Sequence, residues 1–138
     1  MPRQRRRDGR DGGAVTVPKQ GAAPTRAASF GFAFRGVRAL LAAEPNARIH
    51  LLAAAAAVAL GAVLRITPLE WCAVALAIAL VWMAEAFNTA VETICDLVHP
   101  EQHPLVARAK DVAAAGVLGA AIGAAAVGAL VFGARLLG

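Results

Sequence analysis

Three long apolar stretches dominate the pattern of hydrophobic and polar positions along this chain. They cover residues 47–65, 69–98 and 105–136, and short polar breaks that contain proline separate them. Coiled as a helix, each stretch is about long enough to cross a hydrocarbon core of ~30 Å. No run alternates between apolar and polar side chains as a half-buried strand would. Because lipid tolerates only helices and closed barrels, the pattern predicts an all-α integral membrane protein with three transmembrane helices.

A shorter helical pattern precedes the first apolar stretch, over residues 27–43. Its apolar positions recur about once per helical turn, at Phe30, Phe34, Val37 and Leu41. Arg35 and Arg38 lie off that line, where they can reach lipid headgroups. The pattern is typical of an amphipathic helix that lies in the membrane interface.

The first 25 residues and the third apolar stretch differ in composition, and each indicates a different structure. Residues 1–25 are rich in Arg, Gly, Pro and Ala without periodicity, so we expect a disordered basic tail followed by one membrane domain, residues 26–138. In the third apolar stretch, Gly119-xxx-Gly123 is a pattern that lets helices approach closely. Three helices make a thin bundle, so we expect helix contacts within the protein or an oligomer.

The composition adds a strong charge asymmetry to this picture. The chain is 59% hydrophobic and 17% charged, with a formal net charge of +5. Ten of its 14 Lys and Arg residues lie within residues 1–48. No folded basic domain accompanies them, so they indicate attraction to anionic lipid rather than to nucleic acid. By the positive-inside rule, the N-terminus and the 97–110 loop are expected in the cytoplasm.

Polar side chains then interrupt the second apolar stretch. Glu85, Asn88, Glu92 and Asp96 follow an apolar run, and their offsets place them within one stripe of a helix. Ionisable side chains at membrane depth are costly, so such a stripe indicates a functional site. After a short loop, Lys110 opens the third apolar stretch on the same expected side of the membrane.

These residue types suit phosphoryl transfer from a nucleotide to a lipid hydroxyl. Magnesium prefers one or two carboxylates together with phosphate oxygens, and Glu44 and Glu92 can supply them from different helices. Lys110 provides a positive charge for phosphate. Glu85 lies deepest in the apolar stretch, which favours a role as general base, and Asn88 one turn away can orient a carboxylate.

Plainer interpretations stay open for several of these residues. Glu92 and Asp96 can form a solvated helix end, Glu44 can belong to a helix cap, and Lys110 with Asp111 can be ordinary interfacial charge. A small multidrug-type transporter would also place a glutamate in the membrane, near mid-bilayer. A membrane assembly protein could use the same polar residues only to hold helices together.

Three segments together resemble the prokaryotic diacylglycerol kinase family, small membrane lipid kinases that include undecaprenol kinases. The segments are FAFRGVRALLAAEPNARIH (32–50), EAFNTAVETICDLV (85–98) and HPLVARAKDVAAAGVL (103–118). The resemblance covers roughly residues 28 to 135. It implies a homotrimer in the inner (plasma) membrane of a bacterium, with the active sites near the cytoplasmic face, ATP as the phosphoryl donor and Mg²⁺ as the cofactor.

The resemblance also implies roles for single residues. The position of Glu85 is that of the catalytic base, and those of Glu44 and Glu92 bind the metal. The positions implied at the nucleotide are Arg26, Asn88, Glu92, Glu101, His103, Lys110 and Asp111. The positions implied at the lipid substrate are Arg38, Asn46, Arg48, His50 and Ala114.

The choice of lipid rests on small differences within the family. The segment Glu44–His50 resembles the undecaprenol kinase branch more than the diacylglycerol kinase branch. Ala114 occupies a place where the diacylglycerol branch has serine. Undecaprenol is therefore the expected substrate, with diacylglycerol, which would yield phosphatidic acid, as the alternative.

Overall fold

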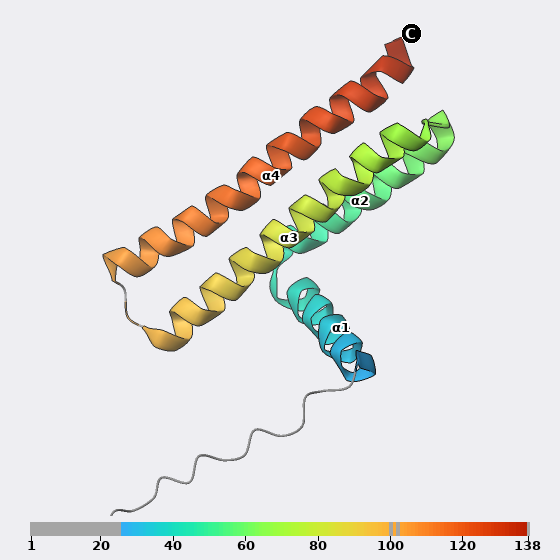
Figure 1. The fold of residues 1–138 in the computed structure, drawn as a ribbon. Helices are drawn as coiled ribbons and strands as arrows, with labels where there is room; N and C mark the ends of the chain where they lie inside the picture. Colours follow the sequence, from blue (N-terminus) through green and yellow to red (C-terminus); the bar gives the residue numbers. More distant parts are fainter. Residues whose placement is uncertain (1–25, 100, 102, 138) are drawn as a thin grey trace, which may run out of the picture.

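The computed structural model describes residues 26–99, 101 and 103–137, with the side chains of residues 26 and 27 left out. Four helices follow one another along the chain (Figure 1): α1 (Arg26–Ala43), α2 (Pro45–Leu64), α3 (Pro68–Val98) and α4 (Pro104–Leu137). The helices α2, α3 and α4 are each long and apolar enough to cross a membrane. The all-helical prediction with three spanning helices is thus confirmed, whereas the expected tail, residues 1–25, lies outside the described residues.

Proline starts each of the three long helices. Pro45, Pro68 and Pro104 are the first residues of α2, α3 and α4, so these helices begin one or two residues earlier than the apolar pattern predicts. Proline suits this position because its missing N–H and fixed φ cost nothing in the first helical turn. The helix α2 also ends earlier than expected, at Leu64, because Arg65 adopts a left-handed conformation with φ of 49°.

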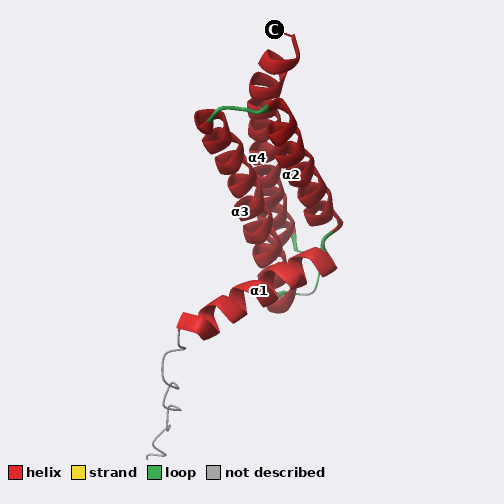
Figure 2. Cartoon of the chain, turned by 90° about the vertical axis from the view of Figure 1, so that its right-hand side faces the viewer, coloured by secondary structure: helices red, strands yellow, loops and turns green. Residues whose placement is uncertain are grey.

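The three long helices pack into an open bundle, and α1 crosses one end of it (Figure 2). The helices α3 and α4 make the most extensive contact, and α2 packs against both. The buried core lies at the end away from α1 and consists of Ile66, Val74 and Val131. Trp71 covers Gly61 there so closely that a Cβ on Gly61 would lie 2.9 Å from the indole ring.

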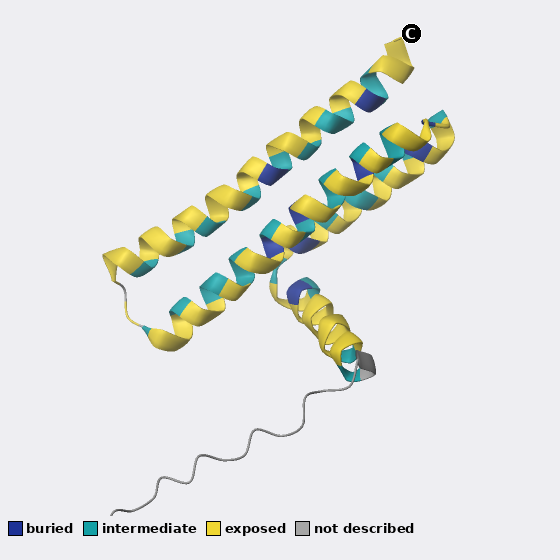
Figure 3. Ribbon diagram, in the orientation of Figure 1, coloured by how far each residue is buried: buried dark blue, intermediate teal, exposed yellow. Residues whose placement is uncertain are grey.

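Much of the apolar surface faces outward (Figure 3), as a lipid environment allows. Large apolar side chains such as Leu52, Leu69 and Leu130 are exposed on all three long helices. Gly119 and Gly123 lie on the outer surface of α4, because a Cβ on either would meet nothing within 4 Å. The small-residue surface is therefore open to lipid or to a second copy.

The helix α1 forms where the sequence predicts it, but its apolar residues do not all share one side. Phe30 and Phe34 are exposed on one side, and the exposed Phe32 lies on another, two residues along the helix. The Arg35 guanidinium stacks over the Phe32 ring at 4.6 Å from its centroid. The location of α1 in the membrane interface stays a prediction.

A polar clasp holds α3 and α4 together at the end away from α1. Thr67 and Glu70 form a capping box at the start of α3, in which Glu70 Oε2 accepts from the Thr67 amide at 2.6 Å. The Arg135 guanidinium, near the end of α4, donates to both carboxylate oxygens of Glu70, at 2.7 and 3.4 Å. One carboxylate thus caps its own helix and fixes a second helix against it.

Glu70→Ala is expected to destabilise the protein more than Arg135→Met does. The alanine removes both the carboxylate's hydrogen bonds within the capping box and the ion pair with Arg135, whereas the methionine removes only the pair. Thermal unfolding in one detergent measures both losses. Arg65→Met, the same charge change at the same end, is the control. A larger loss for Arg135→Met than for Glu70→Ala would contradict the dual role of Glu70.

Candidate active site

Glu85 lies at the edge of the presumed hydrocarbon layer, on the inner face of α3. It is 2% exposed and is the one buried charged residue among those the structure describes. The 20 residues of α2 match the thickness of a bilayer core. The Glu85 carboxylate faces His50, which lies five residues after the start of α2, or ~7 Å along its axis. The level of Glu85 along α2 therefore favours a position near one boundary of a bilayer core over mid-bilayer, where a transporter glutamate is expected.

Three buried oxygens mark the polar face of α3. Glu85 Oε2, Asn88 Oδ1 and Thr89 Oγ1 have no hydrogen-bond partner among the described residues. Residues three and four apart on a helix lie side by side, so the three oxygens share one surface. Buried polar atoms are nearly always hydrogen-bonded, so this surface is a candidate contact for a polar group outside the described residues. Thr89 belongs to the stripe in the sequence, but nothing there gave it a role of its own.

Two further carboxylates approach Glu85. Glu92, on α3, accepts a hydrogen bond of 2.9 Å from Asn88 Nδ2. Glu44 occupies the N-cap position of α2, yet its side chain makes no capping hydrogen bond, so the carboxylate is not used as a cap. Electrostatic interactions couple both groups to Glu85.

The donor set of these residues fits a hard divalent cation. Glu44 and Glu92 carry carboxylates, and Asn88 adds an amide oxygen. Within the described ranges, no three His, Cys, Asp or Glu side chains come close enough to hold a metal by themselves. Magnesium is ordinarily bound by one or two carboxylates, with the remaining ligands from phosphate and water. The binding of magnesium by Glu44 and Glu92 stays a prediction.

A polar pocket lies beyond the membrane end of the stripe, where α3 meets α4. It has a volume of about 590 Å³ and is lined by Asp96, His99, Glu101, His103, Pro104, Val106, Ala107 and Lys110. Lys110 Nζ donates to Asp96 Oδ1 at 2.5 Å and so joins the two helices. The pocket gathers three of the predicted nucleotide residues, Glu101, His103 and Lys110. His99 joins them, with its ring 5.2 Å from that of His103.

The other predicted site residues are less closely gathered. Arg48 is occupied in the fold, because its guanidinium donates to the carbonyls of Leu41 and Ala42 at 2.8 Å and so closes the end of α1. The remaining side chains are exposed, and none lines the polar pocket: Arg38, Asn46, Asp111 and Ala114. Arg26 starts α1, and its side chain lies outside the described residues. Their roles stay predictions.

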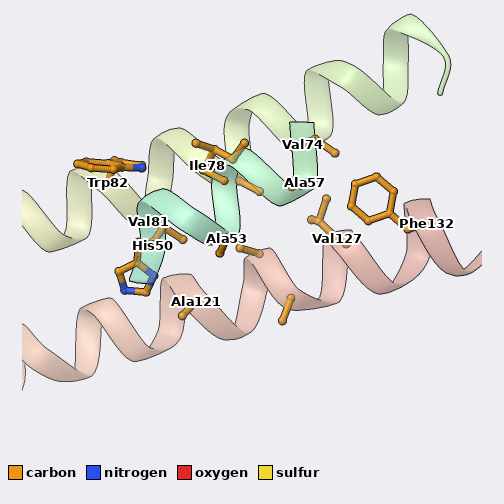
Figure 4. Close-up of a pocket in the computed structure, with 15 residues that line it drawn as sticks. His50, Ala53, Ala57, Val74, Ile78, Val81, Trp82, Ala121, Val127 and Phe132 are labelled. Atoms are coloured by element: carbon orange, nitrogen blue, oxygen red, sulfur yellow. The ribbon is translucent and has the colours of Figure 1, made fainter. Parts of the chain in front are cut away.

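An apolar cavity of about 280 Å³ lies between α2, α3 and α4 (Figure 4), and His50, the neighbour of Glu85, forms part of its lining. Alanines of α2 and α4 make up six of its fifteen lining residues, including Ala53, Ala57 and Ala121. His50 lies at one end and Phe132 at the other, so the cavity runs along the helices from the polar stripe toward the core (Figure 4). Its dimensions and lining suit a hydrocarbon chain.

The chain is similar to known membrane lipid kinases. The family described as prokaryotic diacylglycerol kinase matches residues 31–132. A protein named undecaprenol kinase, from Bacillus subtilis, is 36% identical over 89 residues, which cover 64% of this chain and 72% of that protein. A protein named diacylglycerol kinase, from Synechocystis sp., is 37% identical over 100 residues, which cover 72% of this chain and 57% of that protein.

These matches define the class of protein. The family match spans most of the chain, from α1 through α4, and includes Glu44, Glu85, Glu92 and Lys110. The chain therefore belongs to the prokaryotic diacylglycerol kinase family, a family of membrane lipid kinases. The two relatives carry different substrate names, so the lipid acceptor is a separate question.

Proposed function

We propose that this protein transfers the γ-phosphate of ATP to the hydroxyl group of a membrane lipid, with undecaprenol as the favoured acceptor. The observation that carries the proposal is the position of Glu85. It is a buried carboxylate beside His50, which lines the apolar cavity, and a stripe of polar groups leads from it to a polar pocket. An enzyme that transfers phosphate from a nucleotide to a lipid needs an apolar site for the lipid next to a polar site for the nucleotide.

Glu85 is the proposed general base. Its Oε2 accepts the proton of the lipid hydroxyl while the oxygen forms a bond to the γ-phosphorus, and the bond from that phosphorus to the ADP oxygen breaks. Burial on the inner face of α3 keeps bulk water from the carboxylate. A lipid hydroxyl that reaches the same spot is therefore favoured over water as the acceptor.

The nucleotide is proposed to lie along the polar stripe. Glu44 and Glu92 would hold Mg²⁺, which when bound neutralises phosphate charge. Asn88 holds Glu92 in place through its hydrogen bond. Lys110 would contact phosphate, and Glu101 and His103 line the pocket in which the rest of the nucleotide fits. Asp111 and Arg26 are the remaining residues that we propose to bind the nucleotide.

The separation of the polar pocket from the apolar cavity also indicates how the protein is oriented in the membrane. The polar pocket lies at the end of the bundle that carries α1, and we propose that this end and the N-terminus face the cytoplasm, where ATP is available. The membrane would be the inner (plasma) membrane of a bacterium. The outward-facing Gly119 and Gly123 and the thin bundle support assembly into a homotrimer.

Undecaprenol is expected to be phosphorylated faster than diacylglycerol. Ala114 lacks the hydroxyl that the diacylglycerol branch carries there, and the Glu44–His50 segment resembles the undecaprenol branch. One missing hydrogen bond is worth about 0.5–1.5 kcal/mol, so the preference should be roughly twofold to tenfold.

Parallel initial rates with purified protein, ATP and Mg²⁺ measure this preference, with both lipids at matched mole fractions in one detergent. Ala114→Ser is the informative variant, because it should raise the relative rate with diacylglycerol. A clear preference of the parent for diacylglycerol would reverse the choice of acceptor. Equal absence of turnover with both lipids would contradict the proposed function itself.

A further inference from the structure

We infer that His50 positions the acceptor hydroxyl together with Glu85, so that the hydroxyl lies between the two side chains. This inference rests on the proposed function and adds a second contact to its acceptor site. The resemblance to lipid kinases places His50 only among the residues near the lipid. The structure gives it a specific neighbour.

The two side chains meet across helices. His50 Nε2, on α2, lies 3.9 Å from Glu85 Oε2, on α3, and the side chains are 19% and 3% exposed. This distance is too long for a direct hydrogen bond between them. An oxygen placed between them, with hydrogen bonds of ~2.8 Å to each, spans that distance at an angle of roughly 90°. Because Glu85 Oε2 is fully buried, a hydroxyl oxygen reaches this bridging position when the carboxylate turns toward the cavity.

The same imidazole ring also forms the end of the apolar cavity. His50 lines that cavity together with Val81 and Trp82, as Figure 4 shows. A lipid whose chain occupies the cavity brings its terminal hydroxyl to the ring and to Glu85 at once. His50 and the indole N–H of Trp82 are the polar groups of this cavity's lining, and the other lining residues are apolar.

The chemistry of the neighbours indicates what His50 does. Glu44 and Glu92 are the other charged groups that act on Glu85, and ionised carboxylates only accept hydrogen bonds. A neutral imidazole with its proton on Nε2 can donate one to the hydroxyl oxygen. The hydroxyl then donates its own proton to Glu85, and its remaining lone pair points to the phosphate. During transfer that proton moves to Glu85, the oxygen–phosphorus bond forms, ADP leaves, and His50 keeps its proton.

Comparison of His50→Gln with His50→Met tests the inference. Glutamine and methionine have similar length and volume, but only glutamine carries an N–H donor. We expect His50→Met to lower kcat with undecaprenol about 10- to 100-fold, because a misplaced acceptor loses its alignment. The KM for ATP should stay unchanged. His50→Gln should retain kcat within about fivefold of the parent, since its amide replaces the donor.

Leu52→Ala is the matched control, because Leu52 lies on the same helix, is 71% exposed and takes no part in the proposed site. It should leave kcat unchanged. In a Glu85→Gln background, His50→Met should cause little further loss, because residues that act as one unit are not additive. If His50→Met does not fold, His50→Leu takes its place as the variant without a donor.

Two results overturn the inference while the proposed function stands. One is a His50→Met variant with kcat within twofold of an active parent. The other is a His50→Gln variant as impaired as His50→Met, which would show that the ring serves packing alone. A parent without lipid-dependent turnover overturns the proposed function, and this inference with it.

Discussion

Glu85→Gln is expected to abolish phosphoryl transfer while nucleotide binding persists. Loss of a general base should lower kcat by about 10²–10⁴, because the amide cannot accept the hydroxyl proton. Glutamine keeps the size of the side chain, so the packing around this buried position should be preserved. Lipid phosphorylation measures kcat, and titration with a fluorescent ATP analogue measures binding.

Glu70→Gln is the matched control for this substitution. Glu70 is a glutamate of the same helix, α3, but it lies at the opposite end, where it serves the cap and the ion pair with Arg135. Its variant should keep kcat near that of the parent. Near-native turnover of Glu85→Gln would remove Glu85 from the role of base, whatever the result for Glu70→Gln.

Glu44→Ala and Glu92→Ala are each expected to raise the Mg²⁺ concentration that half-saturates the reaction. Each variant removes one anionic ligand from the pair that would hold the cation, and an increase of about tenfold or more is expected. Glu44 precedes α2 and Glu92 lies on α3, so the two substitutions change different local structures. Similar increases in the required Mg²⁺ concentration are nevertheless expected, because both variants lose a ligand of the same cation.

Activity alone does not separate metal binding from nucleotide binding, so the same variants should be titrated with Mn²⁺. Electron paramagnetic resonance of free Mn²⁺ in the presence of a non-hydrolysable ATP analogue reports binding without turnover. Weaker Mn²⁺ binding in both variants, and unchanged binding in Glu70→Gln, is the expected pattern. Two variants that bind Mn²⁺ and respond to Mg²⁺ as the parent does would show that these carboxylates do not hold the metal.

The helical architecture could be predicted because its signal is local. Apolar stretches of helical length reveal spanning helices wherever they occur, and the stripe of Glu85, Asn88 and Glu92 shows by spacing alone that they share a face. The burial of Glu85 follows from the same pattern, since it lies nearest the apolar run. The helix starts at Pro45 and Pro68 were less predictable, because proline reads both as a break and as a first-turn residue.

Contacts between helices could not be predicted, because they depend on how the helices align. Glu70 and Arg135 are 65 residues apart, and only the antiparallel packing of α3 and α4 brings them together. The approach of His50 to Glu85 depends likewise on the position of α2 against α3. Arg48 hydrogen-bonds the end of α1, a contact that no spacing in the sequence reveals, and its role at the substrate stays a prediction.

The most direct test of the lipid kinase proposal is to follow the phosphate itself. Purified protein in detergent, with Mg²⁺ and γ-³²P-labelled ATP, is offered undecaprenol, diacylglycerol or detergent alone, and the lipid extract is counted after chromatography. The proposal predicts label in a phosphorylated lipid with the parent, most of it with undecaprenol, and at least about 10²-fold less with Glu85→Gln. Absence of label from both lipids with folded parent protein, or equal labelling by the parent and Glu85→Gln, would contradict it.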